Sequence, residues 1–392
     1  MISIVFVDDE VNVLQAMRRT LHSMRNEWNM EFLPSAAAAL DRLAREPADV
    51  IVSDMRMPGM DGWEFLAEVK KLYPQTVRLV LSGHADPGAI MRSVGAAHQY
   101  MAKPCDSATL KTAIAQSQML KNLLHSKALA QLVGHVGMLP SCPQAFQDIS
   151  MCLRQPNASL ADAARIIGRD VAMTADIMKL VNSAFFGARQ SISSVERAVA
   201  YLGLDTLGAL VLGHNLFRGE SCARDGVDLT GLWRHSLQTA TVARTIALHE
   251  KLPLAKAEEA FLAGMLHDVG RVVWATRTDG TAGEPQNSNH ASIGQVNEQH
   301  AAVGAYLLGL WGFPVQLVEA VAHHHTPSRG TDTGFSLTVL VHIADQLAHR
   351  HSADGQVDCG IEPGLLEGLG LLNHLPHWLA VLSVLDNERT AP

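Results

Sequence analysis

The alternation of short apolar runs with longer segments of helical period over residues 1–118 most constrains the fold. The apolar runs are Ile2–Val7, Met30–Leu33, Val50–Ser53, Val77–Leu81 and His98–Met101. Three stretches between them have helical period, namely Val11–Ser23, Ala36–Arg45 and Trp63–Leu72. Strands separated by helices of about ten to fifteen residues pair in parallel, because the chain must cross over between them. The pattern predicts an α/β fold with a doubly wound, five-stranded parallel sheet.

Polar residues stand where these strands end. Asp8 and Asp9 follow the first strand, Asp54 ends the third, Ser82 ends the fourth and Lys103 follows the fifth. In such sheets ligands bind beyond the carboxyl ends of the strands. Three carboxylates crowded there repel one another unless a hard cation such as Mg²⁺ joins them. We therefore expect Mg²⁺ at the three aspartates, Asp54 as nucleophile towards a phosphoryl group, and Lys103 and Ser82 on phosphoryl oxygens.

Each of these residues alone is more often a turn or cap residue, but the ordered set resembles the receiver domains of two-component response regulators over residues 1–118. The resemblance implies that Asp54 is the phospho-acceptor and that Asp9 and Asp54 coordinate Mg²⁺ with Asp8 assisting. Ser82 and Tyr100 match the hydroxyl and aromatic switch positions of that family. It also implies a histidine kinase or phosphotransfer protein as the phosphoryl donor.

Residues 106–131 are predicted to form a helix that Asp106 or Ser107 caps, since no Gly or Pro interrupts the segment. Its apolar stripe consists of Leu110, Ile114, Leu120, Leu123 and Leu124. We interpret the first turns as the last receiver helix, packed on its own sheet. The remainder, residues 119–131, is expected to be a connecting helix that transmits a signal or pairs with a second protomer in a homodimer.

From residue 132 the strand pattern disappears, which predicts an all-α domain over 132–350 and a helical C-terminal extension over 351–392. The extension contains two expected helices, Leu365–Leu372 and Trp378–Leu385. Fifteen of the 19 histidines follow residue 125. The candidate ligands of a Zn, Mn or Fe site are His235, His267, Asp268 and Asp345, with His300, His324 and His325. Imidazoles and carboxylates on inward faces suit such metals, although a single buried histidine is more often a core residue.

The order of these residues is the His…His-Asp…Asp pattern of the HD phosphohydrolase superfamily, and residues 132–350 resemble the HDOD output domain. The segments that carry the resemblance are Leu139–Pro143, Asn182–Gly187, Ile192–Leu202, Leu266–Gly270, His300–Gly304, Trp311–Pro314 and His324–His325. The resemblance implies an HD-like helical module that acts in signalling through an unknown downstream protein partner.

The alternative is a metal-dependent phosphohydrolase, acting on cyclic dinucleotides or other nucleotides and gated by phosphorylation. The sequence departs from the HD-GYP phosphodiesterases at several positions. Arg271 replaces their Lys, Thr326 replaces their Glu, Gly231 replaces the Glu of a third metal, and 326–336 contains no Gly-Tyr-Pro. Because the Lys and the Gly-Tyr-Pro loop are associated with substrate phosphate, we expect a signalling module first and an enzyme second.

Composition limits the partners. Of the net charge of −8 over 392 residues, residues 1–125 contribute only −1, and neither half carries a basic stripe. Nucleic acid is therefore an unlikely direct partner. No apolar run is long enough to span a bilayer, and the apolar opening lacks a basic n-region, so we expect no secretory signal. Five cysteines without paired spacing are typical of reduced thiols, so we expect a cytoplasmic protein without a membrane partner.

Overall fold

The computed structural model describes residues 1–82, 96–103, 107–120, 127–137, 139, 141, 143–155, 157–182, 192–213, 229–275, 293–330, 334–352, 361–362 and 364–379. Its N-terminal part is a five-stranded sheet with the order β2-β1-β3-β4-β5, in which every pair of neighbouring strands is parallel. The strands are Ile2–Val7 (β1), Trp28–Leu33 (β2), Val50–Asp54 (β3), Val77–Ser82 (β4) and Gln99–Ala102 (β5). The predicted sheet is thus confirmed, with strand ends that move by one or two residues.

The register of the strands brings their polar ends to one edge. Val7 pairs with Ser53, Asp54 with Leu81, and Ser82 with Ala102. The residues that follow β1 and β5, and those that end β3 and β4, therefore meet at the carboxyl edge of the sheet. This is the edge at which parallel α/β sheets bind ligands.

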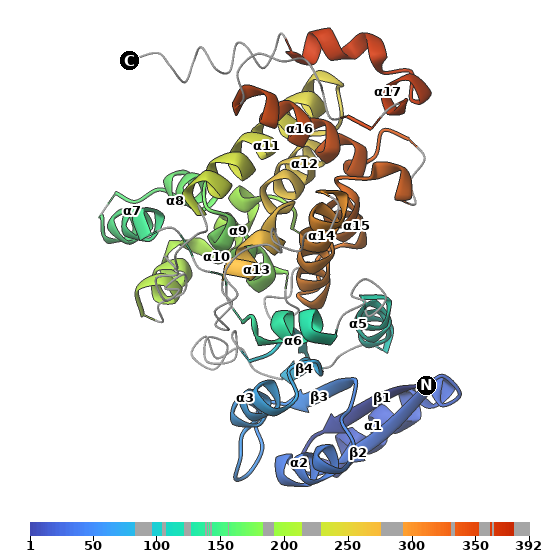
Figure 1. The fold of residues 1–392 in the computed structure, drawn as a ribbon. Helices are drawn as coiled ribbons and strands as arrows, with labels where there is room; N and C mark the ends of the chain where they lie inside the picture. Colours follow the sequence, from blue (N-terminus) through green and yellow to red (C-terminus); the bar gives the residue numbers. More distant parts are fainter. Residues whose placement is uncertain are drawn as a thin grey trace.

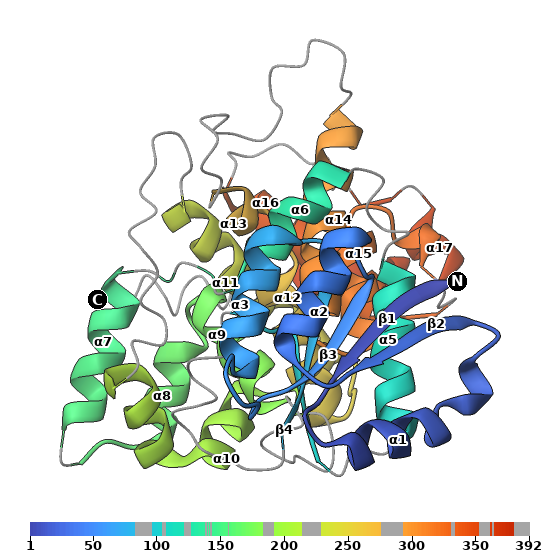
Figure 2. The same cartoon turned by 90° about the horizontal axis from the view of Figure 1, so that it is seen from below.

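Helices cover both faces of the sheet (Figure 2). The residues of α1 (Val11–Thr20) and α5 (Ser107–Leu120) pack on one face, and those of α2 (Ala36–Arg45) and α3 (Gly62–Leu72) pack on the other. A short 3-10 helix, His22–Met24 (η1), follows α1. All five residues of β3 are buried, because helices cover the strand from both sides.

The rest of the described chain is helical, as predicted, and lies above the sheet in Figure 1. The α-helices are α6 (Lys127–His135), α7 (Pro143–Arg154), α8 (Leu160–Ile167), α9 (Val171–Val181), α10 (Val195–Gly208), α11 (Leu229–His249), α12 (Leu254–Leu266), α13 (Val269–Ala275), α14 (Ile293–Leu310), α15 (Val315–His323), α16 (Leu337–Ser352) and α17 (Leu365–Gly368). Shorter helical turns are η2 (Ala209–Gly213), η3 (Pro327–Arg329) and η4 (Leu372–His374). Among the helices of the described residues, none has both the length and the apolar character needed to cross a bilayer.

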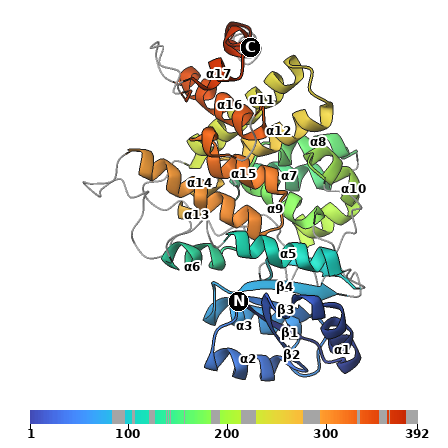
Figure 3. The ribbon, with the colours of Figure 1, turned by 90° about the vertical axis from the view of Figure 1, so that its right-hand side faces the viewer.

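Helices α5 and α6 lie between the sheet and the helical domain, and both contact α14 (Figure 3). Ile114 of α5 and Val133 of α6 are fully buried in one hydrophobic cluster with Phe6 of the sheet and Leu307 of α14. The predicted helix over 106–131 corresponds to α5 and α6, and its residues 106 and 121–126 lie outside the described part. Its expected pairing with a second protomer stays a prediction, although Leu110 and Ile114 are buried within the monomer.

The C-terminal extension packs on the helical domain. Leu366 and Trp378 are buried in a cluster with residues of α11, α12 and α16. The predicted helix Leu365–Leu372 is shorter in the structure, where α17 ends at Gly368 and Gly370 adopts a φ of +70°. That conformation is left-handed and ends a helix. The second predicted helix, Trp378–Leu385, is described only at its start.

Candidate functional site

Two buried carboxylates and one ammonium form a compact site at the carboxyl edge of the sheet. Asp8 and Asp54 are 1% and 8% exposed. The Nζ atom of Lys103 lies 2.6 Å from Asp8 Oδ2 and 2.5 Å from Asp54 Oδ1. The remaining carboxylate oxygens accept backbone N–H groups, from Glu10 to Asp8 Oδ1 at 2.9 Å and from Arg56 to Asp54 Oδ2 at 2.8 Å. The structure thus brings together three of the residues that the sequence selected.

The charges at this edge favour a further cation. Burial lowers the pKa of Lys103, but its hydrogen bonds and ion pairs with Asp54 and Asp8 outweigh burial and raise the pKa above its ordinary value. Lys103 is therefore charged, and two buried carboxylates share its single positive charge. Asp9, next in the chain, is exposed. An oxygen-rich site with excess negative charge has the donor chemistry that Mg²⁺ prefers, so the residues present fit that ion.

Of the two expected switch residues, the structure describes the side chain of Tyr100 but not that of Ser82. Ser82 ends β4 as predicted, but its side chain lies outside the described atoms. Tyr100 of β5 is 5% exposed and packs in the hydrophobic cluster that α2 and α3 form with the sheet. Tyr100 is therefore turned into the protein, three residues before Lys103.

Gly62, the first residue of α3, also shapes this site. A Cβ atom on Gly62 would stand 2.1 Å from the backbone oxygen of Asp54. Its N–H donates to the Met55 carbonyl at 2.9 Å. Only glycine lets the start of α3 approach the acceptor strand so closely.

The second candidate site is a cluster of five imidazoles and two carboxylates in the helical domain. Its members come from several helices: His235 from α11, His267 and Asp268 from the α12–α13 junction, His300 from α14, His324 and His325 from the end of α15, and Asp345 from α16. Gly270 brings α13 against α14, since a Cβ there would lie 2.0 Å from the His300 carbonyl oxygen. All seven residues that the sequence selected meet in this cluster.

The cluster has two carboxylate centres. At the first, Asp345 Oδ1 lies 2.9 Å from His235 Nε2 and 3.4 Å from His267 Nε2. At the second, Asp268 Oδ1 lies 2.9 Å from His300 Nε2 and 3.8 Å from His324 Nε2. Three overlapping sets, His235/His267/Asp345, His267/Asp268/His324 and His300/His324/His325, each have their ligand atoms within 4.8 Å of one another.

Backbone carbonyls orient two of the imidazoles for ligation. His267 Nδ1 donates to the Gly264 carbonyl at 2.7 Å, and His324 Nδ1 donates to the Val321 carbonyl at 2.8 Å. A ring that donates through Nδ1 presents the lone pair of Nε2, which is the arrangement found at metal-ligating histidines. His267 Nε2 is buried without a hydrogen bond of normal geometry. This atom and the mixed nitrogen and oxygen donors fit Zn, Mn or Fe.

Burial and neighbouring charges shift the pKa values of the groups in this cluster. Burial raises the pKa of Asp268, but His267 and His300 outweigh it and hold that pKa well below its ordinary range. Burial lowers the pKa of His267, whereas Asp268 and Asp345 together raise it to about 9. Burial and His300 lower the pKa of His325 to about 4. The cluster therefore combines strongly acidic carboxylates with a protonated His267 and a neutral His325, and carboxylates that hold an imidazolium can also hold a metal cation.

Two further residues reach the carboxylates. Arg271 Nε lies 3.1 Å from Asp268 Oδ2, and His349 Nδ1 lies 3.1 Å from Asp345 Oδ1. The sequence interpretation noted Arg271 only as a departure and missed His349. The spacing of His349, four residues after Asp345 on one helix, is the signal that could have found it.

Comparisons with known proteins match the sheet domain and the helical domain to two different family models. A parallel α/β sheet with an acidic edge, followed by an all-helical domain with an HD-type cluster, defines a two-domain signalling protein. A family model described as the response regulator receiver domain matches residues 4–115, and one described as the HDOD domain matches residues 139–327. The chain is a response regulator with an N-terminal receiver domain and a C-terminal HDOD domain.

Individual relatives cover parts of the chain. An uncharacterized protein of Treponema pallidum is 25% identical over 217 residues, which cover 51% of this chain and 40% of the relative. The hydrogenase transcriptional regulatory protein HoxA of Cupriavidus necator is 41% identical over 104 residues, which cover 26% and 21%. The chain thus spans less than half the length of either protein. The MmoQ response regulator of Methylococcus capsulatus is 22% identical, with a TM-score of 0.48, over 62% of this chain and 98% of that structure.

Proposed function

We propose that the receiver domain accepts a phosphoryl group on Asp54 and that Asp8, Asp9 and Asp54 hold the Mg²⁺ that this transfer needs. The observation that carries the proposal is the position of Lys103, whose Nζ contacts both Asp8 and Asp54. An ammonium at that point neutralises part of the charge on an incoming phosphoryl group. The phosphoryl donor is a histidine kinase or a phosphotransfer protein, as the receiver family implies.

We infer that the HDOD domain is the output module, acting in signalling through a downstream protein partner. It binds Zn, Mn or Fe at His235, His267, Asp268, Asp345, His300, His324 and His325. The support is the convergence of all seven ligand groups with backbone-oriented rings. A metal held there braces these helices against one another, because its ligands come from α11, the α12–α13 junction, α14, α15 and α16.

A short physical connection joins the two sites. Gln99 of β5, next to Tyr100, donates through Nε2 to the Leu310 carbonyl at 3.1 Å. Leu310 ends α14, the helix that carries His300. Phosphorylation that repositions Tyr100 therefore acts on α14 through this contact and through the packing of α5 against α14.

A metal-dependent phosphohydrolase, acting on cyclic dinucleotides or other nucleotides, is the second candidate. The specific observation that favours it is the complete set of HD-type ligands. A metal bound there would supply a nucleophile by lowering the pKa of its water. Arg271 argues against this candidate, because it contacts Asp268 at the position where HD-GYP phosphodiesterases carry a lysine.

Metal analysis combined with hydrolysis assays separates the two candidates. The purified chain is analysed for Zn, Mn and Fe, then assayed with cyclic dinucleotides and nucleotides. Asp268→Ala is expected to lose the metal, whereas His323→Ala, beside the ligand His324 in sequence, keeps it. An empty wild-type site would overturn both metal proposals. Turnover that is present in His323→Ala and lost in Asp268→Ala would replace the signalling module by the enzyme.

The remaining expectations concern the binding partners of the chain and its location in the cell. The domain pair supports action in the cytoplasm with a kinase and a protein partner, rather than with nucleic acid. Self-association through the connecting segment stays a prediction, which mass measurement over a range of concentrations tests. A monomer at every concentration, with and without acetyl phosphate, would exclude the homodimer.

A further inference from the structure

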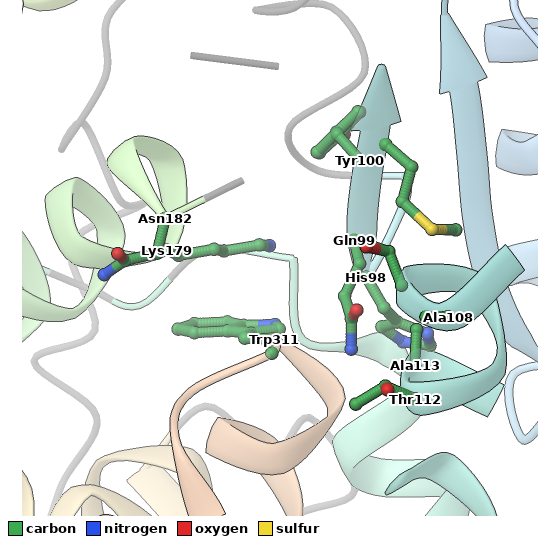
Figure 4. Close-up of a pocket in the computed structure, with 12 residues that line it drawn as sticks. His98, Gln99, Tyr100, Ala108, Thr112, Ala113, Lys179, Asn182 and Trp311 are labelled. Carbon is green, nitrogen blue, oxygen red and sulfur yellow. The ribbon is translucent and has the colours of Figure 1, made fainter. Parts of the chain in front are cut away.

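A cavity of about 360 Å³ lies between the receiver and the HDOD domain (Figure 4). The receiver contributes β5 and α5, which include Gln99 and Thr112. The HDOD domain contributes Lys179 and Asn182 of the α9 end and Trp311, which follows α14. The volume is that of a small-molecule pocket, and pockets at domain boundaries are common binding sites.

The lining has one charged side chain and no carboxylate. Lys179 is 4% exposed, and its Nζ lies 4.3 Å from the centre of the Trp311 ring and donates to the Gly137 carbonyl at 3.2 Å. Figure 4 shows its side chain extended above the indole towards β5. The polar residues Gln99 and Thr112 also line the space, as does Asn182, whose amide is bonded to the backbone of Ile192. The cavity thus joins a buried cation, an aromatic surface and neutral polar groups.

Other buried basic groups raise the positive potential around Lys179. Burial lowers the pKa of Lys179 and outweighs the opposing charge of Asp176, so that with the smaller effects of Lys70 and Arg78 the pKa is about 7. Burial likewise lowers the pKa of Arg78 to about 10. A buried ammonium beside other cations is stabilised by an anion that comes close to it.

We propose that this cavity binds a small organic anion, a carboxylate or a phosphate ester, with its acidic group at Lys179 and its remaining atoms beside Trp311 and Thr112. None of the residues that hold Mg²⁺ or the HD-type metal lines this cavity. The proposed ligand site is therefore distinct from both of those sites, and only its coupling to phosphorylation rests on the proposed function.

The position of the cavity makes such a ligand a regulator of the signal. The anion contacts both domains, so it binds best when they are docked as in the structure. Tyr100 and Met101, in the strand that leads to Lys103, also line the cavity. Ligand binding and phosphorylation of Asp54 are therefore coupled, and the coupling acts equally in both directions.

Calorimetric titration of the full chain tests the proposal with glycerol 3-phosphate as the ester, succinate as the carboxylate and glycerol as the neutral control. Thr112→Phe places a ring at the exposed rim of the cavity, and Ala115→Phe adds the same ring to α5 at an exposed position that does not line it. Lys179→Met removes the charge while keeping the length of the side chain. Anions bound at the receiver or at the histidine cluster are unaffected by the two phenylalanine variants.

One or both anions are expected to bind the wild type, and glycerol is not. Thr112→Phe and Lys179→Met are each expected to weaken binding roughly tenfold or more, because a hydrogen bond to a charged group or the space itself is lost. Ala115→Phe should stay within about twofold of the wild type. Absence of binding by both anions at millimolar concentration, or unchanged affinity in Thr112→Phe, would overturn the proposal.

Discussion

Lys103 and Asp54 form an ion pair across the carboxyl edge of the sheet, with 2.5 Å between Nζ and Oδ1. Lys103 follows β5 and Asp54 ends β3, and β4 lies between the two strands. The contact therefore reports the position of β5 relative to Asp54. If Asp54 accepts a phosphoryl group as proposed, that group would compete for the same ammonium and link phosphorylation to the position of β5.

Replacement of Lys103 by alanine is expected to destabilise the chain by about 2 kcal/mol near neutral pH, because Asp8 and Asp54 lose a shared charged donor. Added Mg²⁺ should restore part of the loss by binding the two carboxylates. Urea unfolding with and without Mg²⁺ measures both effects. Lys111→Ala is the control, since the hydrogen bond that the described residues give Lys111 is an exposed one to Ser23. Equal stability of the two variants would contradict the prediction.

Arg78 of β4 joins the receiver to α6. It is 1% exposed and donates to four carbonyls, those of Ala96 at 2.7 Å, Thr76 at 2.9 Å, Gly134 at 2.8 Å and Pro74 at 3.3 Å. Arg78→Met is expected to cost about 3 kcal/mol, since buried carbonyls lose their donors, and to speed hydrogen exchange at α6. Arg78→Lys should rescue little because an ammonium lacks the planar fork.

Arg25→Met is the control for Arg78→Met, because Arg25 is exposed. Arg25→Met should change the free energy of unfolding by less than about 0.5 kcal/mol. Unaltered exchange at α6 in Arg78→Met would show that this arginine does not couple the two domains.

Stability is expected to fall in acid partly because of His98. Burial, followed by the charges of Arg78, Lys179 and Lys70, holds the pKa of His98 well below its ordinary 6.5. Below that pH the unfolded chain binds a proton that the folded chain does not, so stability is lost as pH decreases. The slope contributed by one such group is about 1.4 kcal/mol per pH unit. His98→Asn should reduce the slope between pH 6.5 and 5 by that amount, whereas identical slopes in urea unfolding would refute the assignment.

Metal binding is expected to stabilise the HDOD domain. Zn²⁺ at about one hundred times its dissociation constant should add about 2.7 kcal/mol to the free energy of unfolding. A chelator should remove the gain. Asp268→Ala should show no gain, and His323→Ala should show the full gain. A metal-independent unfolding midpoint in the wild type would contradict the proposed site.

The sequence predicts that Asp8, Asp54 and Lys103 lie close together, because their places at strand ends determine it. Asp8, Asp54 and Lys103 each lie directly at a strand end, and parallel strands bring those ends to one edge whatever the details of packing. The HD-type residues were found by their order along the chain. Their convergence could not be predicted from helical period alone. The period shows on which face of its helix a residue lies, but not which other helix packs against that face.

The domain contact was not predictable in the same way. Arg78 stands inside an apolar run, where a charged residue is expected to face solvent, yet it is buried because α6 covers it. Lys179 is a further example, since every residue of α9 is buried. Both positions depend on how the sheet and the helices dock, which is information that no local pattern contains.

Phosphorylation of Asp54 followed by hydrogen exchange tests the central claim most directly. The full chain is incubated with acetyl phosphate and Mg²⁺, beside Asp54→Asn and Asp61→Asn, the latter an exposed carboxylate that caps α3. We expect one acyl phosphate on the wild type and on Asp61→Asn and none on Asp54→Asn, with altered exchange at β5 and α14 only where phosphate is present. Equal incorporation in Asp54→Asn, or phosphorylation that leaves exchange at α14 unchanged, would contradict that claim.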